Sequence, residues 1–533
     1  MLPPFFIKMS NLKEIEKLIQ SGDYVKAQQK TELLKAPKST KLAVLASIAL
    51  KAGDFQKSEV LFERALEADP SNILAVGNYG QLLVSQKQFN RALPFCEKVH
   101  LIEVKNEGYL LNYVACLAHV DNFEKAIEVT NKFIERNEKN SLNVKLTLAS
   151  VYRAYLKPKE ALEVLNNALE VHGEEPELER ALADAYAEID PKVASEAFAK
   201  AINNTKKPLP LKWNWSFVEL RMQNFKLGWE LYEAGLDEKI GRVGRPLPAV
   251  MRQFKRVTRI EDLDTVKYTF LAAEQGIGDQ ILFMSTLNEM LPKIAKPILI
   301  CEERMLSIVR RSFPTIEVKT YGFANSLSRQ QDRLNGVFPI GSLMQYCRNS
   351  KEDFIEKRKP YIITNEKQTE EYRKKIEIKY PGKKIIGVSW NGGFWDRQKR
   401  AKSIDFDELV KLLKPEGHIY VSLQYGDVSQ YKKITLEKQL PIVFIDGIDF
   451  KNQLDDWIAL AAVCEKIISV STALVHFAGA AGKKVDLILG ESQSPFIWGL
   501  EEGNSLPYEN VNIFRQRPKE KRNEYIERLK GCL

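Results

Sequence analysis

The chain has 533 residues, a length that suggests two to four domains, each large enough for its own hydrophobic core. Its composition, 44% hydrophobic and 28% charged, is that of an ordinary soluble protein, and no apolar run is long enough to span a bilayer. The net charge of +9 is spread along the chain, so it favours acidic ligands but does not indicate nucleic-acid binding.

The cysteines and the first residues indicate where the protein works. The six cysteines are scattered without a CxxC pair, and they are Cys96, Cys116, Cys301, Cys347, Cys464 and Cys532. This pattern fits reduced thiols in a cytosol better than a disulfide framework or a zinc site. The opening MLPPFFIKMS lacks the basic region and the long apolar run of a signal peptide. We therefore expect a cytoplasmic protein.

A short phrase recurs along the first half of the chain, as in Asp23-Tyr24-Val25-Lys26-Ala27. Its small residues are separated by 31, 34, 34, 35, 33 and 34 residues, and they are Ala27, Ser58, Ala92, Ala126, Ala161, Ala194 and Gly228. Each phrase is a polar turn followed by a helix whose small residue permits close helix approach. This is the 34-residue tetratricopeptide pattern.

One such repeat cannot bury its own apolar face, so we expect residues 1–236 to stack into a superhelix with a concave groove. Such a groove usually binds a peptide or another protein, although a purely structural stalk is the alternative. The histidines His100, His119 and His172 lack the spacing of metal ligands, so we expect them in packing or on the surface.

The seventh copy, residues 222–236, differs from the others because it carries Trp229 and Tyr232, with Trp213 and Trp215 just before it. An aromatic cluster of this kind suits a joint that packs against a following domain. It also suits the core of the last repeat, and both can hold. Residues 237–265 then form a linker rich in arginine and proline.

The second half alternates strands and helices in two blocks. In the first, strands are expected at Tyr268–Ala273 and Pro297–Cys301, with a helix over Gln280–Leu291. The turn EQGIGD between strand and helix is how an α/β domain opens a ligand-facing loop. It matches only two glycines of the dinucleotide fingerprint, because the third would stand at Ile281, so an NAD-type site is not favoured.

The second block contains further strand and helix signals. Strands are expected at Ile385–Trp390, His418–Gln424 and Pro441–Ile445, and helices at Asp405–Leu413 and Asp455–Cys464. Two such blocks predict two doubly wound sheets with a cleft at the carboxyl ends of their strands.

This block ends in a strand–helix–strand unit, EKIISVSTALVHFAGAAGKKVDLILG, which predicts parallel strands at Ile467–Val470 and Val485–Leu489. The helix between them, Thr472–Ala481, would place its free N–H groups at the carboxyl edge of the sheet, where they suit a phosphate. Thr472 and His476 are four residues apart and can face the same side. The alternative is an ordinary buried unit whose Ser471-Thr472 pair merely caps the helix.

Six stretches across Trp215–Gln516 resemble, in the same order, bacterial glycosyltransferases of the heptosyltransferase type. The resemblance is to the branch of that family in which the catalytic module follows tetratricopeptide repeats. They are FKLGWELYEAGL, LAAEQGIGDQILF, IGVSWNGG with RAKSI, VSLQYGD, IISVSTALVHFAGAAGK and SLPYENVNIFRQ. The resemblance implies the GT-B fold, with two Rossmann-like α/β domains. We therefore expect a repeat array at 1–236, a linker at 237–265, an acceptor-side domain at 266–375 and a nucleotide-sugar domain with a C-terminal helix at 376–533.

By this resemblance the donor nucleotide sugar binds the C-terminal domain, with its phosphates on the backbone N–H groups of Thr472 and Ala473. Fixed cations and a helix N-terminus stabilise a departing phosphate. The expected donor-binding residues are Trp390, Asn391, Gly392, Arg400, Lys402, Gln424, Ser471, Thr472, Ala473 and His476. For Arg400 and Lys402, which align with arginines of the family's loop, a solvated charged loop is the alternative.

The acceptor-side loop would contain Gly276 and Gly278, followed by Asp279 at the position of the family's general base. The base must reach the acceptor hydroxyl, and a single displacement of this kind inverts the anomeric centre. The alternative is that Asp279 caps its helix, and Glu274 is the back-up base. The family is usually independent of metal, and no acidic or histidine cluster is visible, so we expect no metal and no cofactor besides the donor substrate.

One residue departs from the family pattern, because Ser471 stands where an aspartate is usual. Serine keeps the capping capacity and loses the charge. This favours either a donor that itself carries a carboxylate, such as a nonulosonic acid, or a degenerate enzyme.

Three functions follow. The first is an inverting, metal-independent transferase whose repeats recruit a protein acceptor, such as flagellin. The second acts on a surface glycan or a lipid-linked acceptor, and the basic segment Arg517–Lys530 could favour peripheral membrane contact. For this segment we favour a helix that packs back across the cleft. The third is a non-catalytic scaffold with a degenerate GT-B module. The residue types at five positions argue against it, namely Gly276, Gly278, Asp279, Thr472 and His476.

Overall fold

The computed structural model of the chain describes residues 10–136, 141–327, 335–392, 402–490 and 495–533. It contains two compact units, Met1–Ala185 and Tyr186–Leu533, which are treated separately below. Within the described ranges, no helix combines the length and the apolar character that a bilayer crossing requires.

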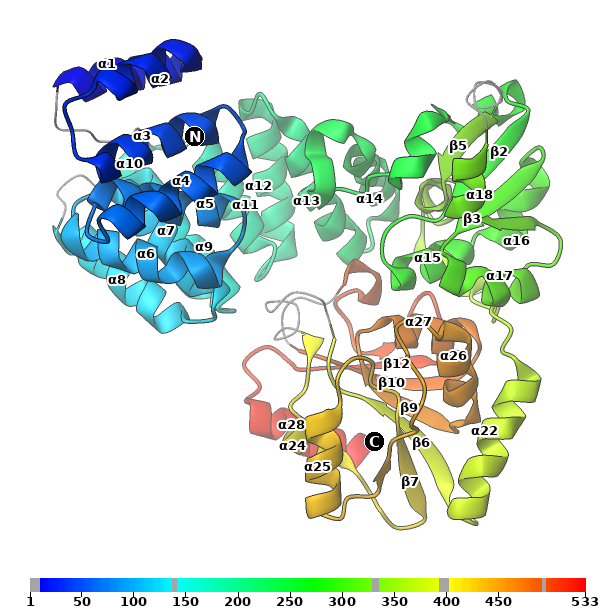
Figure 1. Cartoon of the computed structure of the whole chain (residues 1–533). Coiled ribbons are helices and arrows are strands. Elements are labelled where there is room, and N and C mark those ends of the chain that lie inside the picture. Colours follow the sequence, from blue (N-terminus) through cyan, green and yellow to red (C-terminus); the bar gives the residue numbers. More distant parts are fainter. Residues whose placement is uncertain (1–9, 137–140, 328–334, 393–401, 491–494) are drawn as a thin grey trace. The chain divides into compact units, whose positions relative to one another are not determined.

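Helices alone make up the described part of the first unit (Figure 1, blue and cyan). They are α1 (Ser10–Gln20), α2 (Tyr24–Leu33), α3 (Lys38–Lys51), α4 (Phe55–Ala68), α5 (Ile73–Ser85), α6 (Phe89–Ile102), α7 (Glu107–His119), α8 (Phe123–Arg136), α9 (Leu142–Ala154), α10 (Pro158–His172) and α11 (Pro176–Tyr186). The second unit begins with α12 (Pro191–Asn204), α13 (Pro208–Arg221) and α14 (Phe225–Tyr232). Consecutive helices such as α3 and α4, or α5 and α6, pack against each other as hairpins.

The small residues of the repeated phrase lie at the predicted helix contacts. Ala27, Ser58, Ala92, Ala126, Ala161 and Ala194 are all 0% exposed, and Gly228 is buried as well. A residue with positive φ stands five places before the small residue in six copies, namely Gly22, Gly53, Lys87, Asp121, Leu156 and Gln223. A left-handed residue of this kind ends the first helix of a hairpin and turns the chain toward the second. The predicted repeats are therefore confirmed.

We expect Ala65→Leu in α4 to lower the melting temperature of the helical unit by roughly 2–12 °C, because Ala65 is 0% exposed and overpacking a core usually costs about 1–3 kcal/mol. The matched control is Ala68→Leu on the same helix, where the side chain is exposed and a change under about 2 °C is expected. Calorimetry on both variants measures the difference, and equal shifts would contradict close packing at the repeat position.

The last hairpin packs into the α/β region that follows it, within the second unit. The indole N–H of Trp229 donates to the backbone carbonyl of Arg348 at 2.7 Å, and its side chain is 1% exposed. The Tyr232 ring lies 6.1 Å from that of Phe496. Trp215, in contrast, donates to Glu219 inside the hairpin at 2.7 Å. The aromatic cluster thus serves both as a joint and as a repeat core, as the sequence indicated.

The first sheet has the strand order β1-β5-β2-β3-β4, and all of its pairs are parallel (Figure 1, green). Its strands are β1 (Lys255–Arg256), β2 (Tyr268–Ala272), β3 (Pro297–Cys301), β4 (Glu317–Thr320) and β5 (Asn335–Pro339). The helices around it are η1 (Glu233–Leu236), η2 (Glu238–Val243), η3 (Ala249–Gln253), η4 (Ile260–Thr265), α15 (Ile277–Met284), α16 (Leu287–Met290), η5 (Leu291–Lys293), η6 (Glu303–Met305), α17 (Leu306–Ser312), α18 (Tyr321–Ser326), η7 (Ile340–Leu343), α20 (Met344–Cys347) and α21 (Lys351–Lys357).

Two features of this sheet differ from the expectation. The segment expected as a linker supplies the edge strand β1, which pairs with β5 through Lys255 and Gly336. The single helix expected over Gln280–Leu291 starts earlier and is divided into α15 and α16. At the break, the Thr286 hydroxyl donates to the carbonyl of Phe283 at 2.7 Å, a local bond that competes with the helical pattern.

The second sheet has the strand order β11-β12-β10-β9-β6-β7-β8, and only β11 and β12 pair antiparallel. Its elements in chain order are α22 (Glu366–Lys379), β6 (Lys384–Ser389), α24 (Phe406–Leu412), β7 (His418–Ser422), α25 (Ser429–Glu437), β8 (Ile442–Val443), α26 (Leu454–Val463), β9 (Lys466–Val470), α27 (Ala473–Ala480), β10 (Lys484–Leu489), η8 (Phe496–Trp498), β11 (Gly503–Asn504), β12 (Val511–Arg515) and α28 (Arg522–Cys532). The predicted unit β9–α27–β10 is present with parallel strands, so that prediction is confirmed.

The last helix, α28, packs on α24, and its residues Tyr525, Ile526 and Leu529 are buried in the cluster formed by β6, β7 and β9. The predicted packing across the cleft is therefore wrong, because α28 completes the core of the second sheet.

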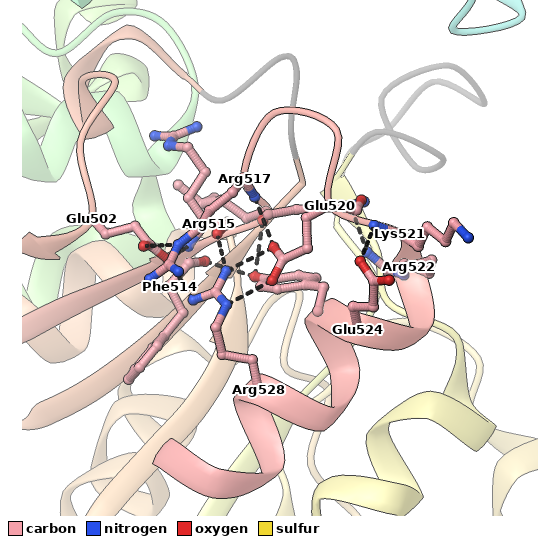
Figure 2. Close-up of polar contacts among 12 residues, drawn as sticks. Glu502, Phe514, Arg515, Arg517, Glu520, Lys521, Arg522, Glu524 and Arg528 are labelled. Atoms are coloured by element: carbon pink, nitrogen blue, oxygen red, sulfur yellow. Dashed lines mark hydrogen bonds and ion pairs between the residues drawn. The ribbon is translucent and has the colours of Figure 1, made fainter.

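The basic residues near α28 are balanced by acids, as Figure 2 shows: Arg528 pairs with Glu520 and Glu502, each at 2.8 Å, and Arg517 pairs with Glu502 at 3.1 Å. Arginines held this way contribute little to a free basic surface.

Candidate functional site

Helices α15 and α27 meet directly, and each starts right after a buried strand of its own sheet. The contact requires glycine at Gly278, because a Cβ built there would lie 2.8 Å from Cδ2 of His476. Tyr361 ties the two helices together. Its hydroxyl donates to the Ile281 carbonyl of α15 at 2.8 Å, and its backbone N–H donates to the Ala480 carbonyl of α27 at 2.8 Å. The structure thus brings the predicted acceptor-side loop against the predicted donor-side helix.

His476 is 7% exposed and lies between two aromatic residues. Its Nδ1 is 3.0 Å from the Tyr508 hydroxyl, and its ring centre is 4.9 Å from that of Trp498. Burial, and then the charge of Lys402, lower the pKa of His476 to about 3. The imidazole is therefore neutral at pH 7 and acts through hydrogen bonding and packing, because it carries no positive charge.

Asp279 lies in the first turn of α15, one residue after Gly278, and is partly exposed. Burial raises the pKa of its carboxyl, while the charge of Lys402 and the backbone N–H groups of Gly276 and Asp279 lower it in part. Burial likewise lowers the pKa of the Lys402 ammonium, which Asp279 raises in part. The two side chains are therefore near enough for each to shift the pKa of the other, and the carboxylate is also placed to cap its helix.

The start of α27 carries two hydroxyl groups that do not cap the helix. The Ser471 hydroxyl accepts a bond from the Trp498 indole N–H at 2.9 Å. Thr472 stands at the N-cap position with extended backbone, but its Oγ1 is buried and has no hydrogen-bond partner among the residues that the structure describes. These side chains therefore do not fit the alternative in which Ser471 and Thr472 only cap the helix. The Thr472 hydroxyl remains an unused donor beside the free N–H groups of the helix.

Gly392 and Lys402 lie beside this helix start. A Cβ built at Gly392 would be 3.0 Å from the Ser471 carbonyl oxygen and 3.4 Å from Cβ of Lys402. The other predicted cation, Arg400, lies outside the described residues. Asp279, Lys402, Gly392, Thr472 and His476 thus converge on one place, from three separate segments of the chain.

The predicted donor residues Trp390, Asn391 and Gln424 form a support behind that place. Gln424 Oε1 accepts from the backbone N–H of Trp390 at 2.9 Å and from that of Asn391 at 2.8 Å. Trp390 is 0% exposed, its ring centre is 5.0 Å from that of Phe406, and its indole N–H has no partner within the described ranges. Gln424 therefore holds the chain after β6 in position, whereas Asn391 is the more accessible member.

Glu274, the expected back-up base, forms a buried ion pair with Arg245. Its Oε1 accepts from Arg245 Nη1 at 2.9 Å, and both side chains are 0% exposed. The backbone N–H of Gly341 donates to the same oxygen at 3.2 Å, and Arg245 also pairs with Glu233 and Ser342. Burial raises the pKa of Glu274 to about 7, while Arg245 lowers it in part. This network joins the end of the last hairpin to the turn that bears Asp279.

Sequence reasoning missed Arg245, Tyr361, Trp498 and Tyr508. Trp498 and Tyr508 orient Ser471 and His476, but no spacing relates them to these partners. Tyr508 lies in a matching stretch, SLPYENVNIFRQ, which was the one available signal. Among the described residues, no group of three or more His, Cys, Asp or Glu side chains could hold a metal ion.

Comparison with known proteins supports the repeats and gives one relative of similar extent. The tetratricopeptide repeat family model matches residues 49–106. The chain is 25% identical over 517 residues to Protein FlbA of Caulobacter vibrioides, covering 91% of this chain and 84% of that protein. It is 38% identical over 63 residues to Stress-induced-phosphoprotein 1 of Caenorhabditis elegans, covering 12% of this chain and 19% of that protein.

A tetratricopeptide repeat protein from Parabacteroides merdae is 17% identical, with a TM-score of 0.38 over 43% of this chain and 92% of that chain. A thermophilic repeat protein of Thermus thermophilus is 21% identical, with a TM-score of 0.29 over 34% of this chain and 99% of that chain. The family match and the helix hairpins establish a tetratricopeptide-repeat region, and a mixed α/β region with parallel sheets follows it.

Because the folded-state pKa of His476 is depressed, its contribution to stability is present above the ordinary histidine value and is lost as the pH falls. We expect the wild-type protein to lose about 2 kcal/mol more than His476→Asn between pH 7 and pH 5, since protonation of the unfolded chain is favoured there. Calorimetry of both proteins at both pH values measures this difference in the free energy of unfolding.

The wild-type pH dependence alone is not enough, because the raised pKa of Glu274 makes the fold more stable as the pH falls over this range. Both proteins contain Glu274, so subtracting one profile from the other isolates the effect of His476. Parallel pH profiles for the two proteins would contradict a buried, neutral His476.

Proposed function

We propose that the chain is an inverting glycosyltransferase of the GT-B type, which moves a sugar from a nucleotide-sugar donor to a protein acceptor recruited by the repeats, such as flagellin. In this proposal the two sheets belong to Rossmann-like domains at residues 266–375 and 376–533, after a repeat array at 1–236, and the segment 237–265 adds the edge strand β1 to the first of them. One observation supports it above all: Asp279 and Lys402 both lie beside the N-terminus of α27, where an acceptor and a phosphate would meet.

Asp279 is the general base in this mechanism. Its carboxylate takes the proton of the acceptor hydroxyl, whose oxygen attacks the anomeric carbon from the face opposite the donor phosphate. The bond from that carbon to the phosphate oxygen breaks, and the nucleotide leaves with the electron pair, so the configuration inverts. Burial raises the pKa of Asp279, which makes its carboxylate a stronger base than a free one, and the charge of Lys402 opposes part of that rise.

The departing phosphate gains negative charge, which three groups at one place can stabilise. Lys402 supplies a cation, the backbone N–H groups at Thr472 and Ala473 supply the positive end of α27, and the unpartnered Thr472 hydroxyl supplies a further donor. With these groups the mechanism needs no metal. His476, neutral and held by Tyr508, lines the site without adding charge.

Ser471 bears on the donor. Its hydroxyl is engaged by Trp498, and it adds no negative charge to a site that already contains Lys402 and a helix N-terminus. A donor sugar that carries a carboxylate, such as a nonulosonic acid, would meet no repulsion from Ser471. The proposal therefore favours an acidic sugar donor.

We expect Asp279→Asn to lower sugar transfer by at least about 100-fold, because the amide cannot accept the acceptor proton, while leaving donor binding and the melting temperature close to wild type. A thermal-shift panel of nucleotides and nucleotide sugars identifies the donor, and transfer is then measured with polypeptide, glycan and lipid-linked acceptors. Surviving transfer would make the base assignment wrong. A wild-type protein that no member of the panel stabilises would favour the scaffold function.

Glu274→Gln is the matched carboxylate variant. We expect it to lower the melting temperature, because Arg245 loses its fully buried charge partner, and to keep transfer within about tenfold below that temperature. Transfer rates and calorimetry on the two variants separate the roles of the two carboxylates. Lost transfer with an unchanged melting temperature would instead identify Glu274 as the base.

A further inference from the structure

The ring of His476 is packed between α15 and Tyr508, so its two nitrogen atoms have different surroundings. On one side, a Cβ built at Gly278 in the first turn of α15 would lie 2.8 Å from Cδ2 and 3.3 Å from Nε2. On the other side, the Tyr508 hydroxyl lies 3.0 Å from Nδ1. Tyr508 comes this close because Gly479 has no side chain, and a Cβ built there would lie 2.6 Å from its ring. Nε2 is therefore the nitrogen next to the acceptor-side loop, and Nδ1 is the nitrogen bonded to Tyr508.

Both side chains are neutral at pH 7, so the ring of His476 carries one proton. Burial, and then the charge of Lys402, lower the pKa of His476 to about 3. Tyr508 is 1% exposed, and burial raises its pKa well above the usual value, so its hydroxyl keeps its proton. In a neutral imidazole one nitrogen donates and the other accepts, and the partner of one decides the role of the other. The direction of the Tyr508–His476 bond therefore decides what Nε2 offers to a ligand.

The Tyr508 hydroxyl proton can be accepted by Nδ1 of His476 or by the hydroxyl oxygen of Tyr361, since both lie within hydrogen-bond reach. Tyr361 donates its own proton to the Ile281 carbonyl at 2.8 Å. A neutral imidazole nitrogen is a much stronger base than a phenol oxygen, so the Tyr508 hydroxyl donates to Nδ1. The ring proton of His476 is then on Nε2.

We propose that Tyr508 is a positioning residue that keeps the proton of His476 on Nε2, so that the ring presents a neutral N–H donor beside the start of α27. The inference rests on the proposed function for its ligand, which is a phosphate oxygen of the donor. That oxygen would accept from Nε2–H as well as from the Thr472 hydroxyl and the free backbone N–H groups of the helix. With the opposite tautomer, Nε2 would turn a lone pair toward the phosphate and repel it.

Solid-state NMR of the full-length protein with isotope-labelled histidine rings tests the tautomer, at about pH 8.5 where histidine is neutral. The chain contains its own reference, because Nδ1 of His119 and Nδ1 of His418 each lie 2.8 Å from a backbone carbonyl oxygen, which can only accept. We expect the signals of His476, assigned by their loss in His476→Asn, to show the proton on Nε2, opposite to these two references. A proton on Nδ1 of His476 overturns the inference.

Tyr508→Phe removes the hydroxyl and keeps the aromatic ring beside Gly479. We expect a second, Nδ1-protonated signal of His476 to appear, because nothing then bonds the Nδ1 lone pair. We also expect pyrophosphate, a probe that carries phosphates without a base or a sugar, to bind about threefold to tenfold more weakly by titration calorimetry. Unchanged signals of the other four histidines show that the variant is folded.

The matched control is Tyr525→Phe, which removes another buried hydroxyl of the same sheet region, one that donates to the Leu489 and Phe514 carbonyls at 3.0 and 2.8 Å. It should keep both the His476 tautomer and the pyrophosphate affinity of wild type. A single Nε2-protonated signal in Tyr508→Phe overturns the role of Tyr508, and an unchanged affinity overturns the phosphate as the ligand of Nε2.

The tautomer measurements need no ligand, so their failure is distinct from a failure of the proposed function. If wild-type protein shows the expected tautomer but does not bind pyrophosphate, the proposed phosphate site is wrong, and the phosphate is overturned as the ligand of His476. The control of the ring proton by Tyr508 would then stand on the spectra alone.

Discussion

Arg245 and Glu274 form an ion pair whose two side chains are fully buried, and the arrangement of the second unit depends on it. Two charges leave water only when their partners are well placed, and removing one partner of such a pair commonly costs about 3–5 kcal/mol. Here Glu233, Ser342 and the backbone N–H of Gly341 complete the network. Because Glu233 belongs to the last repeat hairpin and Glu274 to the turn before α15, the end of the array and the candidate site are held as one piece.

Close packing also determines the contact between α15 and α27. Gly278 admits the His476 ring, and Tyr361 bonds to both helices, so the residues predicted for the acceptor side and for the donor side lie close together. Asp279 and Lys402 each shift the pKa of the other, and His476 is neutral at pH 7 because burial lowers its pKa. In the proposed mechanism, a neutral histidine fills the space beside the base and the phosphate without competing for the proton.

The repeats and the parallel strands could be predicted because they leave a periodic mark. The 34-residue spacing predicted the buried small residues from Ala27 to Gly228, and apolar runs predicted β6, β9 and β10. Two local features were not predictable in this way. The break between α15 and α16 depends on the Thr286 hydroxyl, and the edge strand β1 has only two residues, too few for a pattern. The prediction that α28 packs across the cleft was wrong, because the sequence of a basic helix is compatible with several packing partners.

The sequence by itself determined the order of elements, the repeat period and the set of polar residues around two glycine-bearing turns, because each of these is encoded in neighbouring residues. Only the tertiary structure decided how those residues pair. It assigned Glu274 to Arg245, which is 29 residues away, and Ser471 to Trp498, which is 27 residues away. It placed Lys402 near enough to Asp279 for each to shift the pKa of the other. The physical reason is that such pairings depend on which side chains are buried together, and burial follows from packing between segments that carry no shared period.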